Sequence, residues 1–310
     1  MTHPVIGFIG LGYMGHGMAR NILAQGYVLH VKGNRNRAPV EDLVGQGAQE
    51  CATPREMAQV CDIIHLCLSN SPQVEAVIRG PDGILAGARA GVTVIDCSTS
   101  DPTSTMALAD DLLAHGMTLV DAPLGRTPKE AEAGTLDTMV GASEADFARL
   151  RPVLECWAGN INHVGCVGAG HKMKLVMNFV SMGYAALFSE ALVMGVKSGL
   201  PPQTIDRVLG SSRLSNGFYE TFMKGAVGRD RDIHKFTVAN AAKDLDYAAA
   251  MAQAAGMANP VGAAFRNTFA QARAAGRSDW YVPMMADHVA ELNGLDLAGA
   301  VKKGADDADT

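Results

Sequence analysis

The sequence has few of the features that mark metal-binding or disulfide-rich proteins. Its cysteines include no CxxC pair, and none stands with a histidine at a spacing typical of metal ligands. Most of them lie in apolar, strand-like stretches, which predicts buried thiols in a reducing cytosol. The six cysteines are Cys51, Cys61, Cys67, Cys97, Cys156 and Cys166. We therefore expect no metal site.

The chain also lacks an excess of positive charge. It has 26 Lys and Arg residues against 32 Asp and Glu residues, a net charge of −6 at pH 7. This balance provides no general basic field for a nucleic acid, so we expect no nucleic-acid partner. A small anionic substrate would need a local basic pocket.

No targeting segment or membrane span is evident. The opening MTHPVIGFIG runs into a strand-like pattern without a basic region or a cleavage site. The apolar stretch after Lys174 is interrupted by Asn178, Ser181 and Glu190, which predicts a buried core helix. With 48% hydrophobic and 19% charged residues, the composition is typical of a soluble globular protein. We expect a cytoplasmic protein with no membrane partner.

The chain changes character near residue 168. Before it, short apolar runs alternate with helical patterns, which predicts an α/β fold with a doubly wound parallel sheet. After it the pattern is helical, broken at GLPP, SNG and ANP, and the first helix covers roughly residues 170–198. The predicted strands are VIGFI, VLHV, DIIHLCL, TVIDC, TLVDA and TMVGA. We expect an α/β domain over residues 1–165, an all-α domain over 166–300 and a flexible tail over 301–310.

A glycine-rich loop, GLGYMG, follows the first predicted strand. Gly10 permits a tight turn, Gly12 lets the backbone approach a pyrophosphate, and Gly15 allows close packing of helix on strand. The loop also contains Tyr13 and Met14. A helix that starts here presents free N–H groups to an anion, so the context favours dinucleotide binding over an ordinary turn.

The end of the second predicted strand reads VKGNRNR. An NAD site places an acid there for the ribose 2′-hydroxyl, but this chain has no acid before Glu41. Arginine grips a 2′-phosphate well, so Asn34 and Arg35 favour NADP over NAD. For Lys32 and Arg37, the alternative to a contact with the 2′-phosphate is a position in a solvated basic loop.

The stretch GAGHKMKLVMN places two lysines near the start of the long helix. Lys174 and Asn178 are four residues apart and share a face, whereas Lys172 lies about 200° around the helix from Lys174. Hydride chemistry at a hydroxyl carbon needs a proton partner for the oxygen, and a partly buried lysine can serve. The alternative is a lysine that extends along the surface to water. The pairing with Asn178 favours catalysis.

Five motifs together resemble the β-hydroxyacid dehydrogenase family over nearly the whole chain. They are FIGLGYMGHGMARNI, DCSTSDP, DAPLGRTPKEAEAGTLDTMVGA, GAGHKMKLVMN and AKDLDYA. The resemblance implies an N-terminal Rossmann domain and a helical domain for substrate and oligomerisation. It implies hydride transfer between a nicotinamide and a short 3- or 4-hydroxy acid or its semialdehyde. It also implies a homodimer or a tetramer.

The resemblance assigns site residues in both domains. The family's catalytic lysine matches Lys174, and its substrate asparagine matches Asn178, while Met177 replaces a further asparagine. Ser98 and Thr99 match a strand-end loop expected beside the nicotinamide.

Four more positions are expected near the cofactor. Leu68 and Ser69 replace the family's usual Leu-Pro, and Phe236 and Lys243 match positions near the nicotinamide. Adjacent helical residues do not face each other, so we interpret Asp244 as solvated or as a local cap rather than as the partner of Lys243.

The loop DAPLGRTP departs from the family pattern. Gly125, Arg126 and Thr127 stand where a serine and two glycines usually line a carboxylate pocket. Either Arg126 points to solvent, or its guanidinium meets the acid group of the substrate. Such a loop resembles that of the family's sulfolactaldehyde reductases, so we expect an aldehyde that ends in a carboxylate or sulfonate.

Two other functions share this architecture. An imine reductase lacks a lysine at the position of Lys174, so the lysine argues against that function. A non-catalytic NADP-binding sensor would have lost the lysine, so the presence of both Lys174 and Asn178 disfavours it. A 6-phosphogluconate dehydrogenase needs a longer helical domain. His16 and His171 flank the two glycine-rich stretches, and we assign neither a role.

Overall fold

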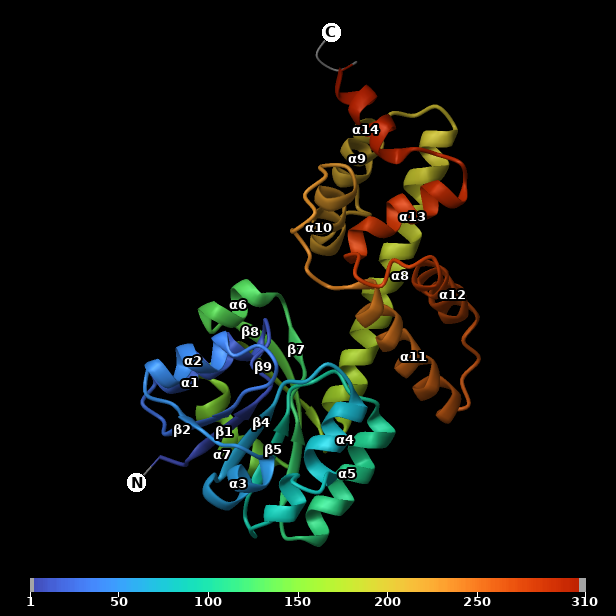
Figure 1. The fold of residues 1–310 in the computed structure, drawn as a ribbon. Helices are drawn as coiled ribbons and strands as arrows, with labels where there is room; N and C mark the ends of the chain where they lie inside the picture. Colours follow the sequence, from blue (N-terminus) through green and yellow to red (C-terminus); the bar gives the residue numbers. More distant parts are fainter. Residues whose placement is uncertain (1–2, 307–310) are drawn as a thin grey trace. The chain divides into compact units, whose positions relative to one another are not determined.

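The computed structural model describes residues 3–306 of the chain (Figure 1). The chain divides into two compact units, Met1–Lys174 and Leu175–Thr310. The first unit is an α/β sheet domain and the second is helical, as the sequence predicts. The division falls inside one long helix, a few residues after the boundary expected at residue 165.

The first unit contains a sheet of nine strands in the order β3-β2-β1-β4-β5-β6-β8-β7, with β9 paired to β8. The strands from β3 to β6 in this order are parallel, whereas β8 runs antiparallel to β6 and to β7. The strands are β1 (Ile6–Ile9), β2 (Leu29–Lys32), β3 (Gln49–Glu50), β4 (Ile63–Leu66), β5 (Thr93–Asp96), β6 (Thr118–Asp121), β7 (Leu124–Gly125), β8 (Leu136–Gly141) and β9 (Ala158–Gly165). The doubly wound parallel sheet is confirmed, and its antiparallel edge is a feature that the sequence did not predict.

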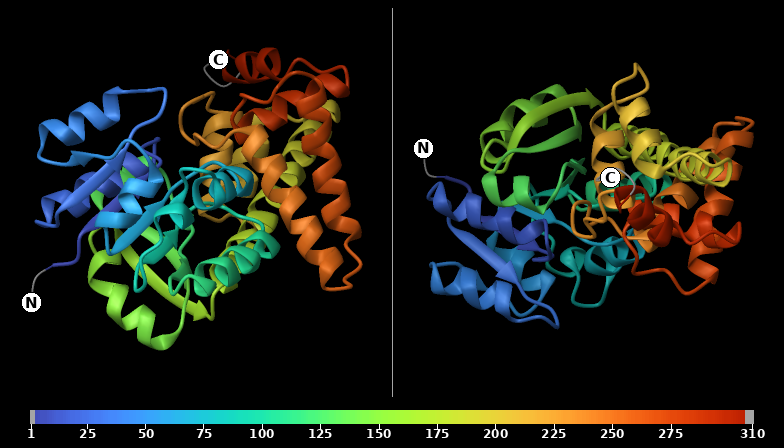
Figure 2. Two further views of the ribbon diagram at one scale, coloured as in Figure 1. Left: turned by 60° about the horizontal axis from the view of Figure 1, so that its bottom comes forward. Right: turned by 90° about the horizontal axis from the view of Figure 1, so that it is seen from above.

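Helices cover both faces of this sheet (Figure 2). Helices α1, α2, α6 and α7 contribute to one apolar cluster, and α3, α4 and α5 contribute to the other. They are α1 (Gly15–Ala24), α2 (Ala38–Gly45), α3 (Pro54–Val60), α4 (Ser71–Arg79), α5 (Pro102–Ala114), α6 (Pro128–Ala133) and α7 (Glu144–Leu154). Strand residues alternate between the clusters, so Phe8 enters the first and Ile9 enters the second.

Polar caps explain where several of these helices begin. Thr53, Asn70 and Asp101 each accept a backbone N–H from the first turn of the helix that follows. A proline follows within the first turn in all three cases, where its missing N–H has no cost. These starts bring the preceding loops to the carboxyl edge of the sheet.

Residues 169–306 form helices and one isolated bridge, between Thr237 and Tyr281. The helices are α8 (Ala169–Lys197), α9 (Pro202–Gly210), α10 (Gly217–Ala226), α11 (Val238–Ala254), α12 (Pro260–Ala274), α13 (Met285–Leu292) and α14 (Leu297–Asp306). Asn216 and Asn259 cap α10 and α12, at two of the predicted breaks. The tail that we expected to be flexible from residue 301 is helical through Asp306, because Val301 is buried and Gln203 donates to its carbonyl at 2.6 Å.

Helix α8 is the core helix of the second unit. By length and composition alone it could cross a membrane. However, Met182, Leu192 and Val193 are buried in the apolar cluster of this unit. A core helix of a soluble domain passes the same test of length and hydropathy, and its buried face explains the apolar sequence.

Candidate active site

The glycine-rich loop has the geometry that its sequence predicts. Gly10 has a φ of 103°, and a Cβ there would lie 2.2 Å from the carbonyl oxygen of Cys67. A Cβ on Gly15 would lie 1.9 Å from the carbonyl oxygen of Gly10, so strand, loop and helix pack without room for a side chain. A Cβ on Gly12, in contrast, would meet nothing within 4 Å. The loop therefore leaves open space beside Gly12 at the start of α1.

The basic residues after β2 differ in their surroundings. Arg37 donates from both terminal nitrogens to the two oxygens of Glu50, each at 2.7 Å. This contact lowers the pKa of Glu50. Arg37, for which we had left a solvated loop open, therefore has a structural role. Asn34 and Arg35 are exposed, and within residues 3–306 Arg35 forms no ion pair.

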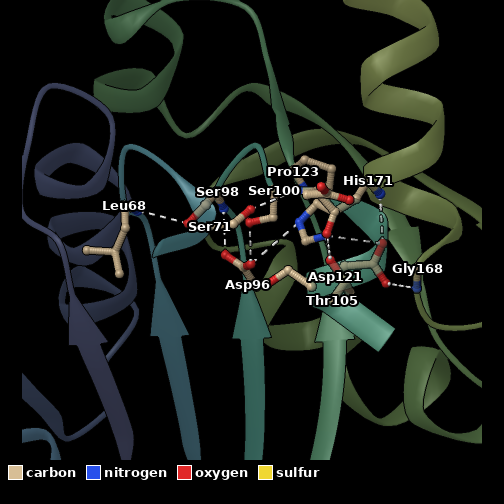
Figure 3. A network of polar contacts seen from close by, with 12 residues as sticks. Leu68, Ser71, Asp96, Ser98, Ser100, Thr105, Asp121, Pro123, Gly168 and His171 are labelled. Carbon is tan, nitrogen blue, oxygen red and sulfur yellow. Dashed lines mark hydrogen bonds and ion pairs between the residues drawn. The ribbon is translucent and has the colours of Figure 1, made fainter. Parts of the chain in front are cut away.

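Two loops at the carboxyl edge of the sheet are joined by hydrogen bonds (Figure 3). The Leu68 N–H donates to Ser98 Oγ at 2.9 Å, and the Ser98 N–H donates to Asp96 Oδ1 at 2.9 Å. The Ser100 hydroxyl donates to Asp96 Oδ2 at 2.8 Å. Ser98, which we expected beside the nicotinamide, is buried and uses its hydroxyl to hold the loop after β4.

A second carboxylate, Asp121 at the end of β6, lies close to the start of α8. It is fully buried and accepts the backbone N–H groups of Gly168 at 2.6 Å and His171 at 2.7 Å. Burial raises the pKa of Asp121, while His171 and the two N–H groups oppose that shift. We had given His171 no role and had not singled out Asp121.

The two lysines at the start of α8 have different environments. Lys172 is exposed, whereas Lys174 is half-buried. One turn later Asn178 is only 8% exposed, and its Nδ2 donates to Asp244 Oδ2 at 2.5 Å. Met177, which replaces a family asparagine, is exposed.

The interpretation of Asp244 as a solvated residue is wrong. It is 1% exposed, and its Oδ1 lies 3.0 Å from the Lys243 ammonium, as an ion pair rather than an aligned hydrogen bond. The ammonium also lies 5.3 Å from the ring centroid of Tyr247. Neighbouring Cβ atoms on a helix diverge, but the long lysine stem lets its ammonium reach the adjacent carboxylate. Asp244 therefore contacts both Asn178 and Lys243.

Two residues of the Gly-Arg-Thr loop, Arg126 and Thr127, each contact a carboxylate. Arg126 has a φ of 74°, and its Nε lies 2.9 Å from Asp137 Oδ2 on β8. Thr127 donates to Glu130 from its N–H at 3.1 Å and from its hydroxyl at 2.5 Å, which anchors the start of α6. The Arg126 side chain is 51% exposed, so it is anchored at one nitrogen and open beyond it.

Phe236 lies in the loop before α11. It packs partly buried against the apolar cluster of the second unit, with its ring at 6.3 Å from that of His234. Thr237 then caps α11, the helix that carries Lys243 and Asp244. Within residues 3–306, no group of three or more His, Cys, Asp or Glu side chains could hold a metal ion.

Comparisons with known proteins agree with this architecture. Residues 5–165 match a family model described as the NAD binding domain of 6-phosphogluconate dehydrogenase. Residues 168–288 match one described as NAD-binding of NADP-dependent 3-hydroxyisobutyrate dehydrogenase. The 3-sulfolactaldehyde reductase of Escherichia coli K12 is 35% identical over 277 residues, 89% of this chain and 93% of the relative. The chain belongs to the β-hydroxyacid dehydrogenase family.

Other members of the β-hydroxyacid dehydrogenase family are also similar. The 2-(hydroxymethyl)glutarate dehydrogenase of Eubacterium barkeri is 44% identical over 207 residues, 67% of this chain and 68% of the relative. A solved structure of Mycobacterium tuberculosis 3-hydroxyisobutyrate dehydrogenase aligns with a TM-score of 0.83 at 28% identity, covering 93% of this chain and 99% of that one. An imine reductase from Pseudomonas shares the fold, at 20% identity.

Membership in the β-hydroxyacid dehydrogenase family confirms the resemblance seen in the five motifs. The protein is an NAD(P)-dependent oxidoreductase that acts on CH–OH groups. The motifs did not reveal the contacts of Asp121 and Asp244. One signal was present for Asp121, because it opens the DAP motif at the end of a predicted strand.

Proposed function

We propose that this protein is an NADP-linked reductase or dehydrogenase that interconverts a short hydroxy acid and its semialdehyde. The observation that carries the proposal is the arrangement on α8. A half-buried Lys174 lies one helical turn before the buried Asn178, whose amide is held by Asp244. An ordered polar pair on an apolar helix is better explained by contact with a reacting oxygen of the substrate than by a role in helix packing.

Lys174 is the proposed proton donor and acceptor. A nicotinamide cofactor, when bound, supplies the hydride for reduction and accepts it in oxidation. In reduction the Lys174 ammonium gives a proton to the oxygen as the carbonyl becomes a hydroxyl, and in oxidation the amine takes that proton back. The Asn178 amide holds the substrate through its remaining hydrogen-bonding capacity, since Nδ2 already donates to Asp244.

The glycine-rich loop fits the phosphates of a dinucleotide. Backbone can approach closely at Gly12, and the first turn of α1 has no side-chain cap to satisfy its N–H groups. We propose NADP rather than NAD because Asn34 and the exposed Arg35 follow β2 where an acid would otherwise stand. The other proposed cofactor contacts are Gly10, Tyr13, Met14, Gly15, Leu68, Ser69, Thr99, Phe236 and Lys243.

In this proposal the substrate ends in an acid group that Arg126 binds. Asp137 lies 2.9 Å from Arg126 Nε, and the arginine side chain is 51% exposed, so its fork of terminal nitrogens can also reach a substrate anion. Such a fork suits a carboxylate or a sulfonate. The names of two relatives, 2-(hydroxymethyl)glutarate dehydrogenase and 3-sulfolactaldehyde reductase, describe compounds with such a group. Gly125 and Thr127 flank the arginine and are proposed to contact the same end of the substrate.

The test is NADPH oxidation with purified protein and a panel of aldehydes. The panel contains sulfolactaldehyde, succinic semialdehyde and methylmalonate semialdehyde, with NADH in a parallel series. We expect the highest kcat/KM with NADPH and with one of the first two, in which the acid group stands one carbon further from the aldehyde than in methylmalonate semialdehyde. No oxidation with any of the aldehydes, in a protein that binds NADPH, would favour the non-catalytic sensor.

We also propose that the protein is a cytoplasmic homo-oligomer, either a dimer or a tetramer built from two dimers. One side of α8 exposes Val176, Val180, Leu187 and Met194. Residues at this helical spacing form a continuous apolar stripe, which a second copy would cover. A monomer by light scattering at micromolar concentration would refute this assembly.

A further inference from the structure

The start of α8 rests on one buried carboxylate. Asp121 ends β6, and its two oxygens accept separate backbone N–H groups, Oδ1 from Gly168 and Oδ2 from His171 (Figure 3). These N–H groups belong to the entry and the first turn of the helix, where no carbonyl of the helix is available to accept them. The carboxylate also lies at the positive end of the helix dipole. Asp121 thus joins the sheet to the start of α8.

Three glycines leave room for this contact. A Cβ on Gly170 would lie 2.3 Å from the Met139 carbonyl oxygen and 2.8 Å from Asp121 Oδ2. A Cβ on Gly141 would lie 2.4 Å from Asp121 Oδ1. Gly168 has a φ of 86°, which residues with side chains rarely adopt. The backbone at the start of α8 therefore lies so close to the Asp121 carboxylate that the helix has little freedom to shift.

His171 makes a second link, to the neighbouring strand. Its Nδ1 lies 2.7 Å from Thr105 Oγ1, and its Nε2 lies 3.7 Å from Asp96 Oδ2 (Figure 3). The Thr105 hydroxyl donates to the Asp101 carbonyl oxygen at 3.1 Å, so it accepts from the Nδ1–H group of His171. Nε2 faces Asp96 at ion-pair distance, without a hydrogen bond. The imidazole therefore lies between Thr105 and the Asp96 carboxylate, beside the start of α8.

Asp96 continues the connection into both loops at the edge of the sheet. Its oxygens accept the Ser98 N–H and the Ser100 hydroxyl, and Ser98 in turn accepts the Leu68 N–H. The loops after β4 and β5 carry Leu68 and Thr99, which are proposed cofactor contacts. An unbroken series of polar contacts thus runs from the first turn of α8 to the loops where the nicotinamide is proposed to bind.

We propose that Asp121 and His171 are positioning residues that fix the position of Lys174 relative to the loops after β4 and β5. The proposal rests on the proposed role of Lys174, which follows His171 by three residues and so lies on the same side of α8. Neither residue acts on the substrate itself. Both act through the placement of the helix start, and a displacement of about 1 Å in a reacting group can reduce a rate roughly a hundredfold.

The test compares three variants with the wild type. Asp121→Asn keeps the shape of the side chain but replaces one acceptor oxygen with an NH2 group that meets a backbone N–H. Thr105→Val is milder, because it leaves Asp121 intact and removes the hydroxyl that contacts the imidazole and the Asp101 carbonyl. Asp62→Asn is the matched control, since Asp62 also accepts a backbone N–H, from Val5 at 2.9 Å, but lies at the opposite edge of the sheet.

We expect kcat to fall at least tenfold in Asp121→Asn and about threefold in Thr105→Val, by displacement of the proton donor. The KM for the aldehyde and the Kd for NADPH should stay within about threefold of wild type. The pH at which kcat is half-maximal should move in Asp121→Asn. The control Asp62→Asn should keep the kcat and the pH profile of wild type even if its melting temperature falls.

Two results would overturn the proposal. One is a wild-type kcat and pH profile in Asp121→Asn, and the other is equal losses of kcat in Asp121→Asn and Asp62→Asn. If Asp121→Asn does not fold, Thr105→Val decides, and an unchanged kcat there refutes the link through His171. Full activity in Lys174→Ala would instead refute the proposed function, so the two failures are distinguishable.

Discussion

Replacing Asp244 with asparagine should impair the use of substrate rather than the binding of cofactor phosphates. In Asp244→Asn, the new amide can still accept from Asn178 through its oxygen, but its NH2 group then faces the Lys243 ammonium. If it flips to satisfy Lys243, two NH2 groups meet instead. Either arrangement breaks one of the two contacts that Asp244 makes at 2.5 Å and 3.0 Å.

The magnitude follows from the burial of the pair. A hydrogen bond to a charged group contributes about 1.5–3 kcal/mol, and Asp244 is 1% exposed, so water cannot replace the lost partner. If that energy orients Asn178 toward the substrate, its loss lowers kcat/KM roughly 10- to 150-fold. The control is Asp246→Asn on the same helix, because the Asp246 side chain is 42% exposed and pairs with Arg266 and Arg273.

The assay is steady-state oxidation of NADPH with the preferred aldehyde, together with NADPH binding by fluorescence. We expect the loss in Asp244→Asn only, with less than a threefold change in Asp246→Asn. A kcat/KM within twofold of wild type in Asp244→Asn would refute the orienting role of this carboxylate. An equal loss in both variants would show that the effect is a general consequence of removing charge from α11.

Three further predictions concern the cofactor, the substrate and acid stability. Arg35→Ala should weaken NADPH binding and leave NADH binding little changed, because only NADPH carries the 2′-phosphate; equal losses in titrations with both would mean that Arg35 does not select the cofactor. Arg126→Ala should lower kcat/KM about tenfold on the preferred aldehyde, because the contact with its acid group is lost, and an unchanged rate and ranking of substrates would contradict the anion contact. Burial lowers the pKa of His65 to about 3, below its unfolded value near 6.5, so its contribution to stability is complete above pH 6.5 and is lost as the pH falls toward 3. Between pH 7 and 5 urea unfolding should therefore show about 2 kcal/mol more loss in wild type than in His65→Leu, and equal losses would refute the assignment.

Elements with strong periodicity could be predicted from the sequence. The six predicted strands and the long helix after residue 168 are present, because alternating apolar runs and a continuous apolar helix leave few other ways to bury their surface. Three strands were missed. The strands β3 and β7 have only two residues and carry no period, whereas β9 reads AGNINHVG, with glycines and polar residues in place of an apolar run. The antiparallel edge around β8 depends on pairing across the sheet, which the local pattern does not encode.

The candidate site shows the same limit. Glycine spacing and the separation of Lys174 from Asn178 are local, so the sequence indicated them. The partners of Asp121 and Asp244 are fifty and sixty-six residues away along the chain, and the fold alone brings them together. Reasoning from helix geometry was wrong for Asp244 in two respects. The long stem of Lys243 reaches the adjacent carboxylate, and the buried partner Asn178 comes from α8.

The most direct test of the account is the rate of Lys174→Ala beside that of Lys172→Ala. Both variants remove a lysine from the start of α8, but Lys172 is exposed and Lys174 is half-buried. General acid catalysis contributes roughly a hundredfold or more, so kcat in Lys174→Ala should fall by at least that factor while NADPH binds nearly as in wild type. Lys172→Ala should keep the wild-type kcat. A Lys174→Ala enzyme with a kcat within a few fold of wild type would contradict the central claim.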